Sequence, residues 1–286
     1  MSTAVETPVP APARRRRTGF DRPRFLWVLY TAMCLYLFVP ILVVIIYSFN
    51  SSKSLQVFGG FSFRWYRAFW NDPDIKASLV ASFEIAAITM VVATVLGTLL
   101  AFGLVRARGR IGGSANILML LPLITPEIVT AVGLLLFFSR FQMELSIKTI
   151  ILGHITFSIS YVTVIVRARL SLLNREVEEA AMDLGATELG ALRLVTLPAL
   201  YPAILASALL VFVLSFDDFV TSVFTSGAGT SPLPVRIYSL LRVGVSPEIN
   251  AVGTTMIAIT LLLALALLPL TLWRRGSETP TVPPAE

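Results

Sequence analysis

The sequence predicts an all-α integral membrane protein that crosses the bilayer six times. Two observations support this prediction. Of the 286 residues, 56% are hydrophobic and only 14% are charged, and the mean hydropathy of +0.80 is too high for a water-soluble domain. Six runs also supply the roughly 20 mostly apolar residues that a helix needs to cross a bilayer. The single cysteine, Cys34, lies inside one of these runs, which excludes an intrachain disulfide framework and a cysteine-ligated metal site.

The six predicted spans form one domain, residues 25–273, between two arms. The spans cover residues 26–49, 79–105, 117–138, 147–166, 200–224 and 252–273. The first run is too long for a cleavable signal peptide, and no small-residue cleavage motif follows it, so we expect it to remain as an anchor. Residues 1–24 are rich in Pro and Ala and then basic, and residues 274–286 have little to bury. Both arms are therefore predicted to be disordered in the cytoplasm, where they contact anionic membrane lipids.

The distribution of Lys and Arg predicts that both termini face the cytoplasm. If the N-terminus is inside, fifteen of the 23 Lys and Arg residues fall in the arms and inner connections, and eight fall in the outer connections. Such a bias is typical of the cytoplasmic side of membrane proteins. The net charge of +6 therefore reflects membrane topology and does not indicate a nucleic-acid partner.

The cytoplasmic segment 174–198 is predicted to form two short helices. Asn174 is placed to cap the first helix, whose first turns are acidic, as the helix dipole favours. Gly185 can adopt the left-handed conformation that ends this helix, and Thr187 can cap the second. Pro198 then limits helical hydrogen bonding where the chain enters the fifth span.

The first of these two helices has an apolar face with small residues at its centre. The face is formed by Val177, Ala180, Ala181 and Leu184. Small side chains allow close docking on another protein. The alternative is a helix that lies on the membrane surface, but such helices favour basic polar faces, whereas Glu178 and Glu179 make this one acidic.

The same segment resembles the cytoplasmic motif of ABC-importer permeases. That motif consists of EAA, three residues, Gly, nine residues, Ile, one residue and Leu-Pro. The matching residues here are Glu179, Ala180, Ala181, Gly185, Val195, Leu197 and Pro198. Every spacing agrees, and the one departure replaces Ile with another branched apolar residue. The resemblance implies a coupling helix that sits in a groove of an ATPase subunit. The expected ATPase-coupling residues are Glu178, Glu179, Ala180, Ala181, Leu184 and Gly185.

No pattern in the sequence indicates an enzyme. None of the three lysines follows a glycine, so the phosphate-binding loop of an ATPase is absent. His154 is the only histidine, which excludes the HExxH zinc site. We therefore expect this chain to bind no cofactor or metal, and ATP and Mg to bind to a partner ATPase. His154 itself is interpreted as a packed or pore-facing polar residue, and a proton relay is the alternative.

Four acidic residues lie within the predicted spans, and no Lys or Arg lies deep in any of them. These residues are Glu84, Glu127, Asp217 and Asp218. Each ionised carboxylate costs roughly 3 kcal/mol to insert at the centre of the membrane, so it should face a wet cavity, a partner or a cation. This favours a path for cations over one for anions. In the alternative interpretation the carboxyl groups form hydrogen bonds that hold the helices together.

The residues around these carboxylates are consistent with a path. In the fifth span, Ser215, Asp218, Ser222 and Thr225 are spaced to form a polar stripe on one helical face. Pro122 and Pro126 predict a bend next to Glu127. The nearby aromatic rings of Tyr161, Phe216 and Phe219 can contact ammonium groups or can simply pack. The expected pathway residues are Asp217, Asp218, Glu84, Tyr161, Phe216 and Ser222.

Longer stretches of the chain are similar to the spermidine/putrescine permease subunits of ABC importers. These stretches are HITFSISYVTVIVRARL, EEAAMDLGAT, LSFDDFVTSVF and LPVRIYSLLRVGVSPEINAV. The resemblance implies a type I, MetI-like permease core in the bacterial inner membrane. It also implies a heterodimer with a paralogous permease, two ATPase subunits and an extracytoplasmic polyamine-binding protein. Two alternatives are an ABC permease for another cationic solute and an ion-gradient-driven transporter, although the EAA-like segment argues against the latter.

Overall fold

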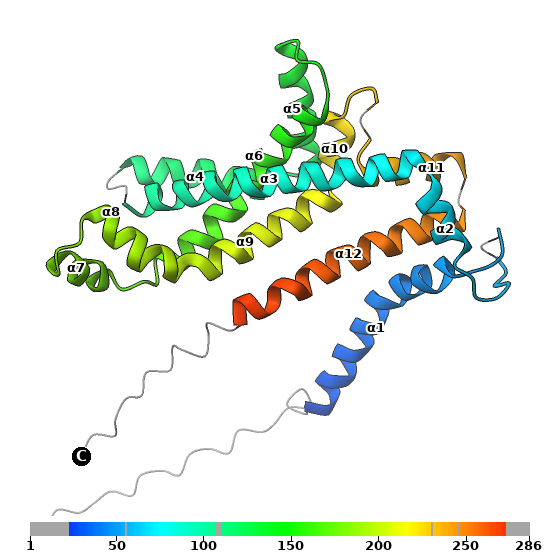
Figure 1. The fold of residues 1–286 in the computed structure, drawn as a ribbon, viewed down its shortest axis with the longest axis horizontal. Helices are drawn as coiled ribbons and strands as arrows, with labels where there is room; N and C mark the ends of the chain where they lie inside the picture. The colour runs from blue at the N-terminus through cyan, green and yellow to red at the C-terminus, as the bar shows by residue number, and fades with distance from the viewer. Residues whose placement is uncertain (1–22, 55, 107–109, 230, 245, 273–286) are drawn as a thin grey trace, which may run out of the picture.

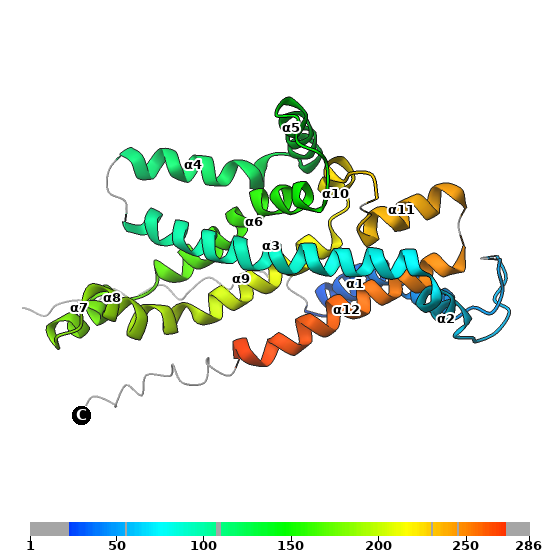
Figure 2. The ribbon, with the colours of Figure 1, turned by 45° about the horizontal axis from the view of Figure 1, so that its top comes forward.

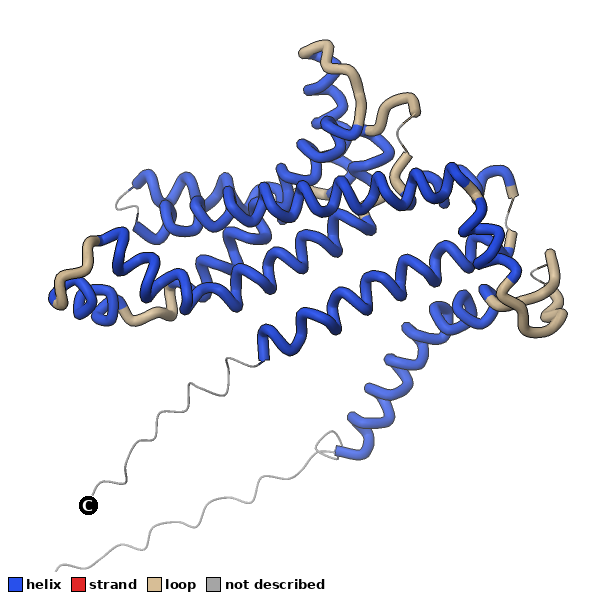
Figure 3. Tube along the Cα trace, in the orientation of Figure 1, coloured by secondary structure: helices blue, strands red, loops and turns tan. Residues whose placement is uncertain are grey.

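The computed structural model describes residues 23–54, 56–106, 110–229, 231–244 and 246–272. Apart from residues 23 and 24, which belong to the first helix, the two predicted disordered arms lie outside these residues. Within the described ranges all regular structure is helical, and one isolated antiparallel bridge pairs Asn50 with Phe61 (Figure 3). The all-α prediction is therefore confirmed.

The described residues form twelve α-helices and one π-helical turn (Figure 1). In chain order they are α1 (Pro23–Ser48), α2 (Arg64–Asn71), α3 (Pro73–Arg106), α4 (Arg110–Ile124), α5 (Glu127–Arg140), α6 (Ile147–Leu170), α7 (Arg175–Asp183), α8 (Glu188–Ala191), the π-helical turn Leu192–Thr196, α9 (Leu197–Asp217), α10 (Val220–Thr225), α11 (Leu233–Val243) and α12 (Pro247–Leu272).

Five helical segments in the described residues are long and apolar enough to cross a membrane, and a bent pair makes a sixth if it is counted as one span. The five are α1, α3, α6, the run from α8 to α9, and α12. In the bent pair, Ile117–Ile124 and Glu127–Arg140 meet at 108°. Five of the six predicted spans therefore correspond to helices of sufficient length, the third corresponds to the bent pair, and the predicted bend next to Glu127 is confirmed.

The bend arises where the chain passes Pro126. Proline has no N–H to donate, and it disfavours helical geometry at Thr125, the residue before it. Pro126 adopts an extended conformation with ψ of 131°, and α5 begins at the next residue. Because the bend is so sharp, α5 projects away from the long helices instead of continuing beside them (Figures 1 and 2).

The fifth span differs from the prediction at both ends. It was expected to run continuously over residues 200–224, but α9 ends at Asp217 and α10 starts at Val220. Asp218 between them is extended, with ψ of 119°, and its carboxylate accepts a hydrogen bond of 2.9 Å from the backbone N–H of Ser222. At its other end the helical run begins earlier, at Glu188.

Two apolar clusters hold the long helices together. The first joins α3, α6 and α9 and contains Ala93, Ala101, Val162, Val166, Leu170, Leu200 and Val211. The second joins α2, α3, α9, α11 and α12 and contains Phe69, Ile75, Ala86, Phe216, Leu233, Val252 and Met256. Gly97 allows α3 to approach α6 closely, because a Cβ at this position would lie 2.6 Å from Cβ of Val162.

The remaining surface of the bundle is strongly apolar. The α1 helix lies along α12, and none of the residues in its most apolar stretch is buried. Apolar side chains exposed in this way suit contact with lipid or with another membrane subunit, because both offer an apolar environment. The α7–α8 segment lies at one end of the bundle, and α2 and α11 lie at the opposite end (Figures 1 and 2).

Candidate functional site

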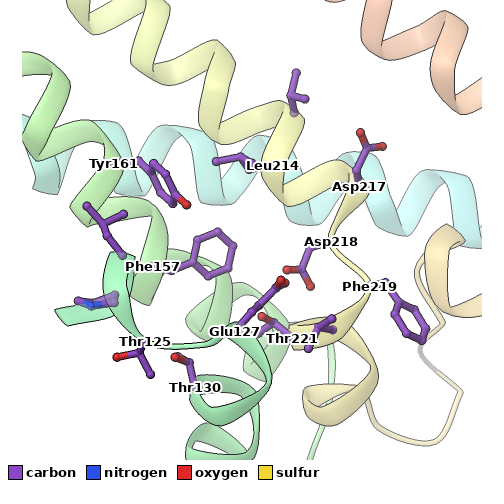
Figure 4. Close-up of a pocket in the computed structure, with 14 residues that line it drawn as sticks. Thr125, Glu127, Thr130, Phe157, Tyr161, Leu214, Asp217, Asp218, Phe219 and Thr221 are labelled. Carbon is purple, nitrogen blue, oxygen red and sulfur yellow. The ribbon is translucent and has the colours of Figure 1, made fainter. Parts of the chain in front are cut away.

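A cavity of about 440 Å³ lies where the bent α4–α5 pair, α6 and the break between α9 and α10 come together (Figure 4). Its polar lining includes three carboxyl groups, and its apolar lining includes aromatic rings. The residues of these two kinds are Glu127, Asp217, Asp218, Phe157, Tyr161 and Phe219. No Lys or Arg is among the described residues that line this cavity, which we call the carboxylate pocket.

Glu127 and Asp218 face each other across the carboxylate pocket. Their side chains point toward one another (Figure 4). Glu127 is the first residue of α5, where the positive end of the helix dipole stabilises an anion. Two carboxylates that face each other in one cavity repel, and a cation between them relieves this repulsion. The pair is therefore suited chemically to receive a positively charged group.

His154 lies behind Asp218 and is completely buried. Its Nε2 is 3.3 Å from Oδ1 of Asp218 and 3.2 Å from Oγ of Ser222, and its Nδ1 is 2.7 Å from Oγ of Ser215. The interpretation of His154 as a packed polar residue is thus confirmed. The predicted polar stripe does not lie on one continuous helix, because the helix breaks at Asp218. Three of its members instead converge on the imidazole ring.

The predicted pathway residues separate into three groups. Asp217, Asp218 and Tyr161 line the carboxylate pocket. Ser222 and Phe216 are buried and do not line it; Phe216 belongs to the apolar cluster against α3 and α12. Glu84 is exposed on α3, outside the pocket lining.

Sequence reasoning missed one aromatic residue of the pocket. Phe157 lies one helical turn before Tyr161 on α6, and the two rings make an edge contact with centroids 6.5 Å apart. Their four-residue spacing places them on the same face of the helix. This spacing was the signal in the sequence that could have identified Phe157.

The α7–α8 segment folds as its capping residues predict. The side chain of Asn174 accepts a hydrogen bond of 3.0 Å from the N–H of Glu176, at the start of α7. Gly185 ends that helix with φ of +95°, a conformation that only glycine adopts without strain. The hydroxyl of Thr187 accepts a hydrogen bond of 3.1 Å from the N–H of Gly190 and so caps α8.

The chain leaves the apolar face of α7 uncovered. No residue of α7 is buried. Val177 is 53% exposed, and Leu184, directly after the helix, is 90% exposed. Large apolar side chains that extend from the end of a bundle in this way are typical of surfaces that dock on another protein.

The two neighbouring acidic residues of α7 point in different directions. Glu178 faces the body of the chain, where it lies 3.6 Å from Arg106 at the end of α3 and accepts a hydrogen bond from the buried hydroxyl of Thr196. Glu179 is mostly exposed and contacts only Arg175, at 3.6 Å, among the ion pairs of the described residues. Glu178 therefore holds α7 to the bundle, and Glu179 remains available at the surface.

Residues 93–278 match the family described as binding-protein-dependent transport system inner membrane component. The chain belongs to this family. The matched region includes both the carboxylate pocket and the α7–α8 segment. As a member of this family the chain is a multi-pass component of the inner membrane that takes part in transport and is not an enzyme, in agreement with the prediction.

Two curated relatives are similar to this chain over most of its length. The putrescine transport system permease protein PotI of Escherichia coli (strain K12) is 42% identical over 230 residues, which are 78% of this chain and 82% of the relative. The spermidine/putrescine transport system permease protein PotC of Haemophilus influenzae is 37% identical over 244 residues, which are 85% of this chain and 93% of the relative.

Solved structures confirm the MetI-like permease fold. A chain of a bacterial ABC transporter involved in the import of the acidic polysaccharide alginate matches 91% of this chain and 98% of its own length, with a TM-score of 0.72 and 13% identity. A chain of an amino acid ABC transporter matches with a TM-score of 0.59 and 19% identity, over 74% of this chain and 98% of its own length. Another alginate transporter structure contains an alginate-bound periplasmic protein.

Proposed function

We propose that the chain is the permease subunit of an ATP-driven importer of polyamines such as spermidine and putrescine. It forms a heterodimer with a paralogous permease, and the two line the translocation path. Two ATPase subunits and an extracytoplasmic polyamine-binding protein complete the importer. The observation that supports this proposal most strongly is the carboxylate pocket, which has three carboxyl groups and no Lys or Arg among the described residues that line it. The chain's relatives are polyamine permeases.

The carboxylate pocket suits the chemistry of a polyamine. A polyamine is an extended chain of ammonium groups joined by methylene segments. Glu127 and Asp218 receive one ammonium group between them, and Asp217 lines the same cavity. The rings of Phe157 and Tyr161 contact ammonium groups through their faces and methylene groups through their apolar surface. An anionic solute would find no compensating charge in this lining.

The exposed α7 helix is the element that couples the permease to the ATPase. ATP and Mg bind to the ATPase subunit, because this chain has no phosphate-binding loop. The apolar face of α7 docks in a groove of that subunit, with Glu179, Ala180, Ala181, Leu184 and Gly185 at the contact. Glu178, which holds α7 to Arg106 and Thr196, transmits the movement into the bundle.

One continuous helical run connects the α7–α8 segment with the carboxylate pocket. It extends over 30 residues from Glu188 to Asp217, a length of about 45 Å at 1.5 Å per residue. Asp217 at its far end lines the pocket. Displacement of α8 by the ATPase therefore moves the pocket as well, as alternating access to the two sides of the membrane requires.

In this proposal the α7–α8 end of the bundle faces the cytoplasm, as do both termini. The opposite end, with α2 and α11, faces the binding protein. The excess of Lys and Arg predicted for the inner connections supports this orientation.

Reconstitution of the complete importer tests the proposal. The chain, its paralogous permease and the ATPase subunits are placed in liposomes, and binding protein is added with or without spermidine or putrescine. We expect only the loaded binding protein to stimulate ATP hydrolysis and uptake of the polyamine. Stimulation by another cationic solute alone would replace the substrate assignment. Uptake that persists with a hydrolysis-dead ATPase would instead indicate an ion-gradient-driven transporter.

A further inference from the structure

Asp218 occupies an unusual position in the backbone, because it lies between two helices that share one apolar span. The last carbonyls of α9 and the first N–H groups of α10 have no helical partners across this break. The Asp218 carboxylate satisfies one of these donors through its hydrogen bond with the N–H of Ser222, at 2.9 Å. The same carboxyl group lines the carboxylate pocket. Its orientation therefore determines both the geometry of the break and the charge presented to the pocket.

His154 contacts both sides of this break from a third helix, α6. Its ring reaches Ser215 in the last turn of α9, at 2.7 Å, and Ser222 in α10, at 3.2 Å. It also reaches Asp218 at the break itself, at 3.3 Å. A single buried side chain thus connects three residues that are separated from it by more than sixty positions in the sequence.

The hydrogen-bonding partners of His154 determine which of its ring nitrogens carries the proton. An ionised carboxylate can only accept hydrogen bonds, so the Nε2 atom that faces Asp218 must carry the proton. In the neutral imidazole with its proton on Nε2, Nδ1 accepts from the hydroxyl of Ser215. Oδ1 of Asp218 then accepts from both His154 and the N–H of Ser222. The second carboxylate oxygen remains free for the pocket, where Glu127 faces it (Figure 4).

We infer that His154 is a positioning residue for transport: it holds the Asp218 carboxylate toward the carboxylate pocket and keeps α9 and α10 in register across their break. The inference rests on the proposed function, because it assigns Asp218 to the substrate path. It predicts that His154 acts through Asp218 and makes no contact with the substrate itself.

A double-mutant cycle in the reconstituted importer tests this inference. His154→Leu removes both hydrogen-bonding nitrogens at similar volume, and we expect it to lower the initial rate of polyamine uptake about tenfold, as the loss of a hydrogen bond to a charged group does. In a chain that already carries Asp218→Asn, we expect the same change to lower the remaining uptake less than about twofold. His154→Gln, whose amide can still donate to Asp218, should recover part of the loss.

The matched control is Ser158→Ala. Ser158 lies one turn after His154 on α6, is also buried, and its hydroxyl has no partner among the described residues. We expect this variant to transport normally. Size-exclusion chromatography of each assembled complex shows whether a variant is incorporated.

The possible outcomes distinguish the inference from the proposed function. An equal fold-loss from His154→Leu with and without Asp218→Asn would mean that His154 acts only on folding or assembly, and would overturn the inference. Unchanged uptake in His154→Leu would do the same. Failure of the unmodified importer to respond to polyamine-loaded binding protein would instead overturn the proposed function, and the positioning role with it.

Discussion

The side chains of Arg106 and Glu178 lie 3.6 Å apart, so the end of α3 contacts the helix that the chain exposes at that end of the bundle. Glu178 also accepts a hydrogen bond from Thr196, in the π-helical turn that leads into α9. Both α3 and α9 belong to the apolar cluster that packs against α6. One carboxylate thus connects the proposed coupling helix with two of the long helices of the bundle.

Removal of this carboxylate should uncouple ATP hydrolysis from transport. The exposed pair with Arg106 contributes only about 0.2–1 kcal/mol, but the buried hydroxyl of Thr196 loses its acceptor when Glu178 is removed. We therefore expect Glu178→Ala to lower polyamine uptake several-fold while the ATPase still co-purifies, and Glu178→Gln, which keeps an acceptor, to lower it less. The measurement is the number of polyamine molecules transported per ATP hydrolysed.

Glu179→Ala is the matched comparison for this prediction. Among the ion pairs of the described residues, Glu179 makes only an exposed contact with Arg175, so its removal should not disturb the bundle. If Glu179 faces the ATPase as proposed, the variant should instead weaken co-purification of the ATPase subunit. Identical effects of both variants on the ratio of transport to hydrolysis would contradict the separate roles assigned to the two carboxylates.

Neutralisation of the carboxylate pocket should impair uptake without disturbing assembly. We expect Asp218→Asn and Glu127→Gln each to lower uptake by about tenfold or more, because each removes one of the two charges that face each other. Asp217→Asn should have a smaller effect, because its exposed side chain is not part of that pair. Uptake into proteoliposomes is the measurement, and co-purification with the ATPase reports on assembly.

Glu84→Gln serves as the control for charge loss within a predicted span. Glu84 is exposed on α3 and does not line the pocket, so we expect near-normal uptake. Normal transport by Asp218→Asn, or a loss in Glu84→Gln as large as in the pocket variants, would argue against the pocket as the cation path.

Enlargement of Gly97 should destabilise the contact between α3 and α6. A Cβ at this position would lie 2.6 Å from Cβ of Val162, and overpacking of this kind costs about 1–3 kcal/mol. We expect Gly97→Ala to lower the melting temperature in detergent. Gly103→Ala is the control on the same helix, because its added Cβ would meet nothing within 4 Å. A lower melting temperature for Gly103→Ala than for Gly97→Ala would contradict this explanation.

Asn50 should hold the connection between α1 and α2 in place. Its side chain accepts from the N–H groups of Ser52 and Gly59 and donates to the carbonyl groups of Ser54 and Val57. Loss of these bonds frees the segment that contains Lys53. We therefore expect Asn50→Ala to increase the rate of tryptic cleavage after that lysine at least several-fold, as detected by mass spectrometry of the fragments.

The control for this loop is Gln56→Ala, an exposed position in the same connection. It should leave the cleavage rate near that of the unmodified chain. Equal cleavage of the Asn50→Ala variant and the unmodified chain would show that the backbone of the loop is held by other contacts.

Much of the fold was predictable because its signals are local. The apolar runs identify the spans through their length, and Pro126 predicts the bend that precedes α5. Asn174, Gly185 and Thr187 delimit the two short helices, because capping depends on residues only two or three positions apart. The α11 helix was not predicted, because the connection in which it lies contains no long apolar run.

The candidate site was only partly predictable, because its geometry depends on contacts between residues far apart in the sequence. The sequence indicated carboxylates in the spans, and Asp217, Asp218 and Tyr161 do line the pocket. It did not exclude Glu84, which is equally acidic and lies in an equally apolar run, and it did not indicate that Phe216 packs in the core. Which face of a long apolar helix turns inward is a property of its neighbours.

By itself the sequence determined that this chain is a helical membrane protein, where its spans lie, and which short segment carries the permease motif. Composition and local spacing are sufficient for these properties. Only the tertiary structure decided that the fifth span breaks at Asp218, that His154 contacts both sides of the break, and that Glu127 faces the same carboxylate. These contacts join residues more than sixty positions apart, and their geometry depends on how α5, α6, α9 and α10 pack against one another, which no local pattern encodes.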